Sequence, residues 1–144
     1  MIMKEKIQKK RSQKGFTLVE LVIVIAILAI LAAIAIPVIT TTINSAKYSI
    51  LESDGKTVEM VFKDALATYK TNLNVTYNSK TPKTATLGDV LAENNIEPKV
   101  MSVRKINGID YCLGWNNMTE GIVINSGSAA SAIDLTWNIS SLDK

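Results

Sequence analysis

The chain has 144 residues and a mass of 15.7 kDa, which is about the size of one domain and too small for a two-domain enzyme. It contains no histidine and a single cysteine, Cys112, which excludes histidine-based triads, imidazole metal sites, multi-cysteine clusters and an intramolecular disulfide. The chain has a net charge of +3, and its basic character lies in the first 15 residues, which hold six basic side chains and one acidic. The rest has 10 basic and 12 acidic side chains, a balance that does not favour nucleic-acid binding.

An apolar segment follows this basic arm, from Phe16 to Ile39, and Glu20 is its one charged residue. The 19 residues of Leu21–Ile39 nearly span a hydrocarbon core of about 30 Å when helical, so we predict a membrane-crossing helix. The basic arm predicts a cytoplasmic N-terminus, with everything after residue 40 outside. A secretory signal peptide cleaved after Ala33-Ile34-Ala35 is the alternative.

Helical periodicity continues beyond the apolar segment to about residue 72. Glu52 precedes Lys56 and Glu59 precedes Lys63 at the i, i+4 spacing, which indicates a solvated face. Gly55 is a predicted weak point, because glycine inside a helix costs about 1 kcal/mol relative to alanine. The opposite face is predicted to be apolar and to comprise Leu51, Val58, Phe62, Leu66, Tyr69 and Leu73.

The remaining residues predict a loop, a short helix and strands. Residues 71–86 are polar and favour a loop, after which Thr86 and Asp89 have the spacing of a helix N-cap and its partner. Asn107-Gly108 between two apolar runs predicts a β-hairpin with a type I′ turn. We expect an antiparallel sheet of three to four strands over the apolar face of the long helix, an α+β fold. The expected strands are Val103–Ile106, Ile109–Trp115, Met118–Ile124 and Ile133–Ile139.

Three side chains of these strands are candidates for special roles. In Ile109–Trp115, the residues Ile109, Tyr111, Leu113 and Trp115 alternate with Asp110, Cys112 and Gly114, which indicates one buried and one wetter face. Trp115 and Trp137 follow strand alternation, which favours the core over exposed adhesive platforms. Cys112 lies within a strand and is interpreted as a small packed side chain.

The stretch Lys14-Gly15-Phe16-Thr17-Leu18-Val19-Glu20 combines several chemical features. A small residue at the end of the arm would give a peptidase access to the backbone at the membrane surface. A carboxylate inside hydrocarbon costs several kcal/mol and needs a proton or a partner. Cleavage after Gly15 would create an α-ammonium on Phe16, and a neighbouring helix shifted along its axis could bring that amine to Glu20.

The segment Lys14–Pro37 resembles the N-terminal signature of type IV prepilins, and the absence of a cysteine pair resembles the disulfide-free pilins of Gram-positive bacteria. The resemblance implies the pilin fold, a long N-terminal helix packed against a C-terminal antiparallel sheet. It implies that a prepilin peptidase cuts between Gly15 and Phe16 and methylates the Phe16 amine with S-adenosylmethionine. It also gives Phe16 and Glu20 roles in assembly, and it places Pro37 where family helices bend or melt on assembly.

Four regions follow from this interpretation. Residues 1–15 form a leader, 16–40 the transmembrane and assembly half of the helix, 41–72 its amphipathic half, and 73–144 a globular head. The precursor is expected in the cytoplasmic membrane with its head outside, and the mature protein in a cell-surface pilus. Expected partners are further copies of the chain, the prepilin peptidase, the pilus assembly platform and its motor ATPase, and the membrane before assembly, without a specific nucleic acid.

The predicted function is a structural subunit of a filament that serves adhesion, twitching motility or aggregation. No nucleophile with a base, no phosphate loop and no metal cluster can be assembled from the sequence, so no catalysis, resident cofactor or metal is expected. A pseudopilin of a type II secretion or DNA-uptake system is the first alternative. A single-pass membrane-anchored binding domain is the second.

Overall fold

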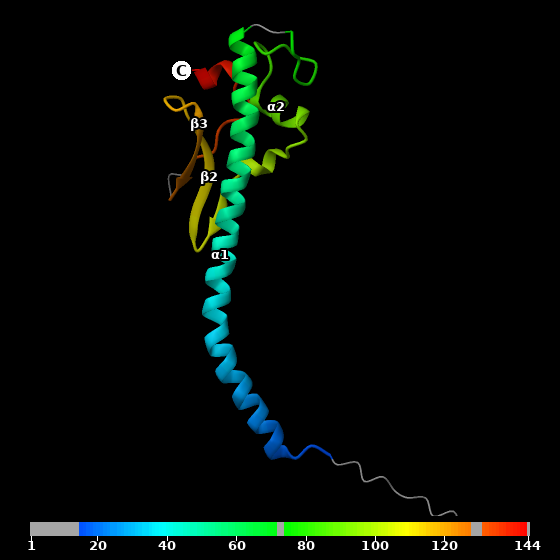
Figure 1. The fold of residues 1–144 in the computed structure, drawn as a ribbon, viewed down its shortest axis with the longest axis vertical. Helices are drawn as coiled ribbons and strands as arrows, with labels where there is room; N and C mark the ends of the chain where they lie inside the picture. The colour runs from blue at the N-terminus through cyan, green and yellow to red at the C-terminus, as the bar shows by residue number, and fades with distance from the viewer. Residues whose placement is uncertain (1–14, 72–73, 128–130, 144) are drawn as a thin grey trace, which may run out of the picture. The chain divides into compact units, whose positions relative to one another are not determined.

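The computed structural model describes residues 15–71, 74–127 and 131–143. The chain divides into two compact units, Met1–Thr40 and Thr41–Lys144. Helix α1, Leu18–Thr71, begins in the first unit and ends in the second (Figure 1). The long helix predicted from about residue 16 to about residue 72 is therefore confirmed.

The described part of the first unit consists of residues 15–17 and the first part of α1. Every residue from Gly15 to Thr40 is exposed. Pro37 lies inside α1 without ending it, although its ring removes one backbone donor from the helix. The Thr40 hydroxyl one turn later donates to the Ile36 carbonyl oxygen at 2.9 Å, so it adds a hydrogen bond next to the proline.

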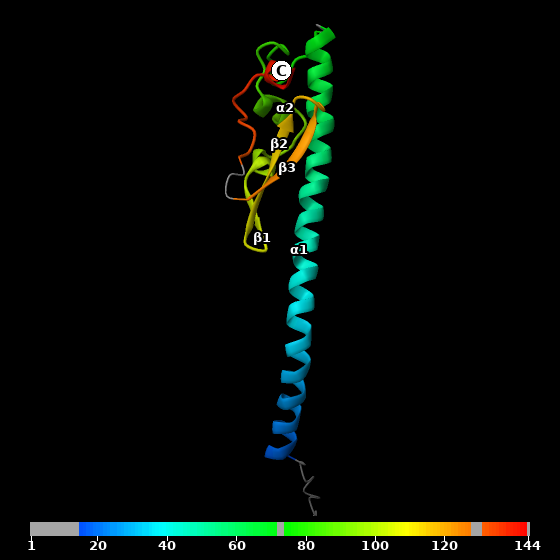
Figure 2. The ribbon, with the colours of Figure 1, turned by 90° about the vertical axis from the view of Figure 1, so that its left-hand side faces the viewer.

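The second unit contains a three-stranded antiparallel sheet in the order β1-β2-β3. Its strands are β1 (Arg104–Ile106), β2 (Ile109–Asn116) and β3 (Gly121–Ser126). Asn107 and Gly108 have φ values of 51° and 78°, the two positive angles that the predicted type I′ turn requires. Figures 1 and 2 show the sheet and α2 (Leu87–Glu93) against the part of α1 in this unit, which confirms the α+β, pilin-like fold.

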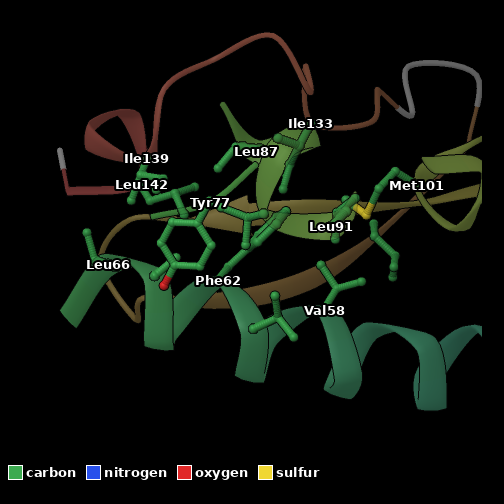
Figure 3. Packing of buried hydrophobic residues seen from close by; sticks show 14 of the residues in the cluster. Val58, Phe62, Leu66, Tyr77, Leu87, Leu91, Met101, Ile133, Ile139 and Leu142 are labelled. Atoms are coloured by element: carbon green, nitrogen blue, oxygen red, sulfur yellow. The ribbon is translucent and has the colours of Figure 1, made fainter. Parts of the chain in front are cut away.

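The core of the second unit forms on one face of α1. The predicted stripe is buried at Leu51, Val58, Phe62 and Leu66. Tyr69 is partly buried against the core, and Leu73 lies outside the described residues. Residues from the loop, α2, η1 (Pro98–Met101) and the C-terminus close over this stripe (Figure 3), and they include Tyr77, Leu87, Leu91, Met101, Ile139 and Leu142.

Gly55 is buried where α1 meets the sheet. A Cβ atom on Gly55 would lie 3.2 Å from Leu113 Cδ2 and 3.3 Å from Ile122 Cγ2, which is closer than side chains normally pack. The glycine predicted as a weak point therefore allows the strands to approach the helix. Its propensity cost is offset by this packing.

Glu59, predicted to lie on the solvated face of the helix, also contacts the sheet. It pairs with Lys63 at 2.7 Å, as expected from their spacing, and its Oε2 also accepts from the Ile122 N–H of β3 at 3.0 Å. These two contacts lower the pKa of Glu59. The carboxylate satisfies a donor on the edge of the sheet, where unpaired N–H groups invite pairing with other chains.

Helix α2 begins at a capping box, as the sequence predicted. The Thr86 hydroxyl accepts from the Asp89 N–H at 3.2 Å, and Asp89 Oδ2 accepts from the Thr86 N–H at 2.9 Å. The buried Asp89 carboxylate also binds the Lys80 ammonium at 2.8 Å and the Asn78 side-chain amide at 3.0 Å. These contacts hold the pKa of Asp89 well below its usual range, and the hydrogen bond from Lys80 has the largest effect.

The strand predicted for Ile133–Ile139 is wrong. Asp134 Oδ1 accepts from the Thr136 N–H and hydroxyl at 2.9 and 2.7 Å, which creates a turn in this segment. The carbonyl oxygens of Leu135 and Trp137 accept from Gly88 and Leu87, so they satisfy N–H groups at the start of α2 rather than a strand ladder. The segment then enters the short 3₁₀ helix η2 (Ile139–Asp143).

The burial predicted for the tryptophans holds for one of them. Trp115 is partly buried and packs edge-on against Phe62, with ring centroids 6.2 Å apart. Trp137 is 51% exposed, because its segment forms a turn instead of a strand facing the core. The prediction that Trp137 belongs to the core is therefore wrong.

Two further strand predictions need correction. The third strand begins at Gly121 rather than at Met118, since Asn116 Oδ1 accepts from the Met118 N–H at 2.9 Å and turns the chain. In β2, Cys112 and Gly114 are buried although the wetter face was expected there, while Ile109 is exposed. The C-terminal segment covers the middle of β2, with the Ile133 N–H donating to the Leu113 carbonyl oxygen.

The Asp89 network predicts the acid sensitivity of the fold. Because the folded-state pKa of Asp89 lies below the value of about 3.9 in an unfolded chain, its stabilisation is present above pH 4 and is lost as the pH falls through and below that value. We expect Asp89→Asn to reduce the free energy of unfolding at pH 7 by about 2 kcal/mol and to flatten its decline in acid. Chemical denaturation of the full chain in detergent at several pH values measures both effects.

Asp110→Asn is the matched control for this experiment. The Asp110 carboxylate pairs with Lys105 at 3.3 Å on the surface, where an ion pair contributes about 0–1 kcal/mol. The control should retain the stability and the acid dependence of the parent chain. Equal effects of the two substitutions would contradict the stabilising role of the Asp89 network.

Candidate processing and assembly site

The peptide bond predicted for cleavage lies just before α1. Residues Gly15 to Thr17 have no regular secondary structure, and the helix begins at Leu18. The Phe16 side chain is 85% exposed, and among the described residues beyond its chain neighbours no atom lies within 4 Å of the position that a Gly15 Cβ would take. This backbone is open to an enzyme, while the leader predicted for residues 1–15 lies outside the described residues apart from Gly15.

Glu20 has a partner within its own helix. Its Oε2 accepts from the Thr17 N–H at 2.8 Å and from the Thr17 hydroxyl at 2.9 Å. The Thr17 hydroxyl oxygen in turn accepts from the Glu20 N–H at 3.2 Å. Thr17 and Glu20 therefore form a capping box that satisfies donors at the start of α1.

Thr17 is the site residue that the sequence analysis did not single out. Its signal was present, because Thr17 and Glu20 have the spacing that identified Thr86 and Asp89 at the start of α2. From the sequence, Glu20 is predicted to need a proton or a partner, and the amine of a neighbouring chain is considered as that partner. The structure supplies a partner three residues earlier, on a side chain that also begins the helix.

The Glu20 carboxylate has one oxygen available for a further interaction. Both Thr17 groups bind Oε2, and within the described part of the chain no donor is bound to Oε1. The helix N-terminus also carries a partial positive charge that favours a carboxylate in the first turn. The local geometry therefore holds Glu20 in place and leaves Oε1 open to a second donor.

The apolar residues after Glu20 are uncovered in this chain. The large apolar side chains from Leu21 to Ile39 are exposed by 46 to 65%, and α1 is long and apolar enough to cross a membrane by length and composition. Such a surface needs lipid or other protein around it. The predicted assembly residues are also exposed: Phe16 and Glu20 lie just before this apolar run, and Pro37 lies within it.

The described residues bring together no cluster of the side chains that usually bind metal ions. No group of three or more His, Cys, Asp or Glu side chains there could hold a metal ion. Cys112 is buried, and this burial raises the pKa of its thiol and disfavours the reactive thiolate. The interpretation of Cys112 as a packed side chain agrees with this environment.

A comparison with known families matches residues 10–36 to the prokaryotic N-terminal methylation motif, which is the signature of type IV prepilins. The matched residues include Gly15, Phe16 and Glu20 and end one residue before Pro37. No curated protein and no solved structure matches the chain. The motif, on a chain with this fold, supports a type IV pilin-like or pseudopilin-like protein, and it indicates a structural subunit rather than an enzyme.

The capping box predicts how the start of α1 responds to substitution. Thr17→Ala removes the acceptor of the Glu20 N–H, so that amide should exchange its hydrogen about fivefold faster, in line with a cap worth about 1 kcal/mol. Thr17→Ser should retain the parent rate. NMR-detected hydrogen exchange of the chain in micelles measures this amide.

Thr40→Ala serves as the control, because the Thr40 hydroxyl donates to a carbonyl within the same helix, far along the chain from Glu20. It should leave the exchange of the Glu20 amide unchanged. An unchanged rate in Thr17→Ala would show that the capping box does not protect the start of the helix.

Proposed function

We propose that this protein is a structural subunit of a type IV pilus and that it polymerises through the first part of α1. The observation that carries the proposal is the prepilin motif on a helix whose apolar side chains are uncovered in its own chain. When such a helix leaves the membrane, packing against the same helix of other subunits keeps its apolar side chains out of water, which is worth about 25 cal/mol per Å² of apolar surface relative to exposure. Contacts of this kind that do not close on themselves produce a filament.

Processing is the first step of the proposed function. A prepilin peptidase cleaves between Gly15 and Phe16 and transfers a methyl group from S-adenosylmethionine to the new amine of Phe16. The exposed backbone at Gly15, without regular secondary structure, supports access by such an enzyme. S-adenosylmethionine belongs to the processing enzyme and is not a cofactor of this chain.

Glu20 is proposed to select the incoming subunit. The amine of Phe16 in a neighbouring chain binds Oε1, while Thr17 continues to hold Oε2. A charged pair in a water-poor environment is far more stable than either charge alone. Entry into the filament thus becomes more favourable than isolation in the membrane.

Before assembly, the chain is proposed to lie in the cytoplasmic membrane with its basic N-terminus inside and its second unit outside. An assembly platform and a motor ATPase then add it to a pilus on the cell surface. Adhesion, twitching motility or aggregation are the proposed activities of the filament. The uncovered apolar helix supports membrane anchoring in the precursor.

The direct test is the intact mass and N-terminal sequence of the protein in material sheared from the cell surface. We expect a chain that begins at methylated Phe16, in filaments visible by electron microscopy after immunolabelling. A processed chain found only in short structures within the envelope would favour a pseudopilin. A chain that begins at Ile36, or one that remains uncut, would contradict pilin processing.

Glu20→Ala tests the assembly step separately from processing. We expect filament yield to fall at least tenfold, because the amine of the incoming subunit loses its counter-charge. Cleavage between Gly15 and Phe16 should continue as in the parent chain. Glu52→Ala is the matched control, since Glu52 is an exposed glutamate on the same helix, paired with Lys56 at 3.1 Å. Equal filament yields from the two variants would disprove the role of Glu20.

A further inference from the structure

A cavity of about 310 Å³ in the second unit has no part in the proposed polymerisation. It lies between β2, β3 and the C-terminal segment, and its volume is at the lower end of the range for ligand pockets. None of its ten lining residues is charged, although 20% of the chain is Asp, Glu, Lys or Arg. A charged ligand would find no counter-ion there, so the lining favours a neutral one.

The lining offers polar groups that are not used by the fold. Asn117, Trp137 and Ser141 line the cavity, and their side chains form no hydrogen bond with any residue that the structure describes. An amide and a hydroxyl each supply both a donor and an acceptor, and the indole supplies a donor. Such donors and acceptors are suited to the hydroxyl groups of a ligand, because a hydroxyl group both donates and accepts hydrogen bonds.

Trp137 adds an apolar surface to these polar groups. Its side chain is 51% exposed, while its backbone is fixed by hydrogen bonds from its N–H to Asp134 and from Leu87 to its carbonyl oxygen. A large exposed indole on a fixed backbone provides a flat surface for an apolar ring face. The C–H groups on one face of a pyranose ring have this character.

The other walls of the cavity are held in place before any ligand binds. The Trp115 indole N–H donates to the Leu142 carbonyl oxygen at 3.1 Å, and the Asn125 side-chain amide donates to the Ser131 carbonyl oxygen at 3.3 Å. Gly114 leaves room for this amide, because a Cβ there would clash with Asn125 Nδ2. A pre-formed site loses less entropy on binding.

We propose that this cavity binds one pyranose unit of an uncharged saccharide, with the ring stacked on Trp137 and its hydroxyl groups bonded to Asn117 and Ser141. Phosphorylated or sialylated sugars are excluded as preferred ligands by the uncharged lining. The proposal concerns the second unit alone. It holds whether or not the chain polymerises.

The test is saturation-transfer NMR and isothermal calorimetry on the full chain in a zwitterionic detergent, since glycoside detergents would compete for the site. The probes are maltotriose, chitotriose and lactose, with 3′-sialyllactose as the anionic counterpart of lactose. We expect saturable binding of at least one neutral probe in the millimolar range. Absence of binding by all three neutral probes, or preference for sialyllactose over lactose, would overturn the proposal.

Variants connect that binding to this cavity. Trp137→Ala should weaken the affinity at least tenfold, and Asn117→Ala should weaken it several-fold while leaving the aromatic surface in place. Met118→Ala is the control, because Met118 is 98% exposed, follows Asn117 in the chain and is not part of the lining. Thermal unfolding verifies that each variant is folded, and full affinity in folded Trp137→Ala and Asn117→Ala would refute the site.

Discussion

The first part of α1 carries apolar side chains that its own chain leaves uncovered, and the rest of the protein depends on this constraint. A helix that is apolar on all sides requires lipid or other helices around it. The same helix continues into the second unit, where one of its faces, from Leu51 onwards, is buried in the core. One continuous element thus serves two environments, which accounts for its 54 residues.

Glu20 shows how such an environment can hold a carboxylate. The capping box with Thr17 gives one oxygen its donors within the chain and leaves the other open. A carboxylate without any hydrogen-bond donor would be costly in hydrocarbon. A carboxylate with donors on both oxygens would gain little free energy from binding a neighbouring chain. The half-satisfied carboxylate is therefore well suited to the assembly role proposed for it.

The C-terminal segment covers the core of the second unit, whose cysteine, Cys112, is not in a disulfide. Ile139 and Leu142 enter the core, and carbonyl groups of Leu135 and Trp137 satisfy the start of α2. Lys70 at the end of α1 binds Glu120 at 2.6 Å and Asp143 at 2.9 Å, which connects the helix to the sheet and the C-terminus. This arrangement leaves the Trp137 ring exposed beside an uncharged cavity.

The sequence by itself determined the features that depend on neighbours along the chain: the span of α1, the Thr86–Asp89 cap, the Asn107-Gly108 turn and the N-terminal motif. Only the tertiary structure decided between strand and turn at Ile133–Ile139. Alternation of apolar and polar residues leads to a strand only where a neighbouring strand is available to form the hydrogen bonds of a sheet. The tertiary structure also decided the role of Gly55 and the second contact of Glu59, since both depend on Ile122, more than 60 residues away along the chain. Local hydrogen bonds and helical periodicity depend on residues that are close in the sequence, so they can be predicted from it. Packing partners are distant in the sequence and come together only when the chain folds.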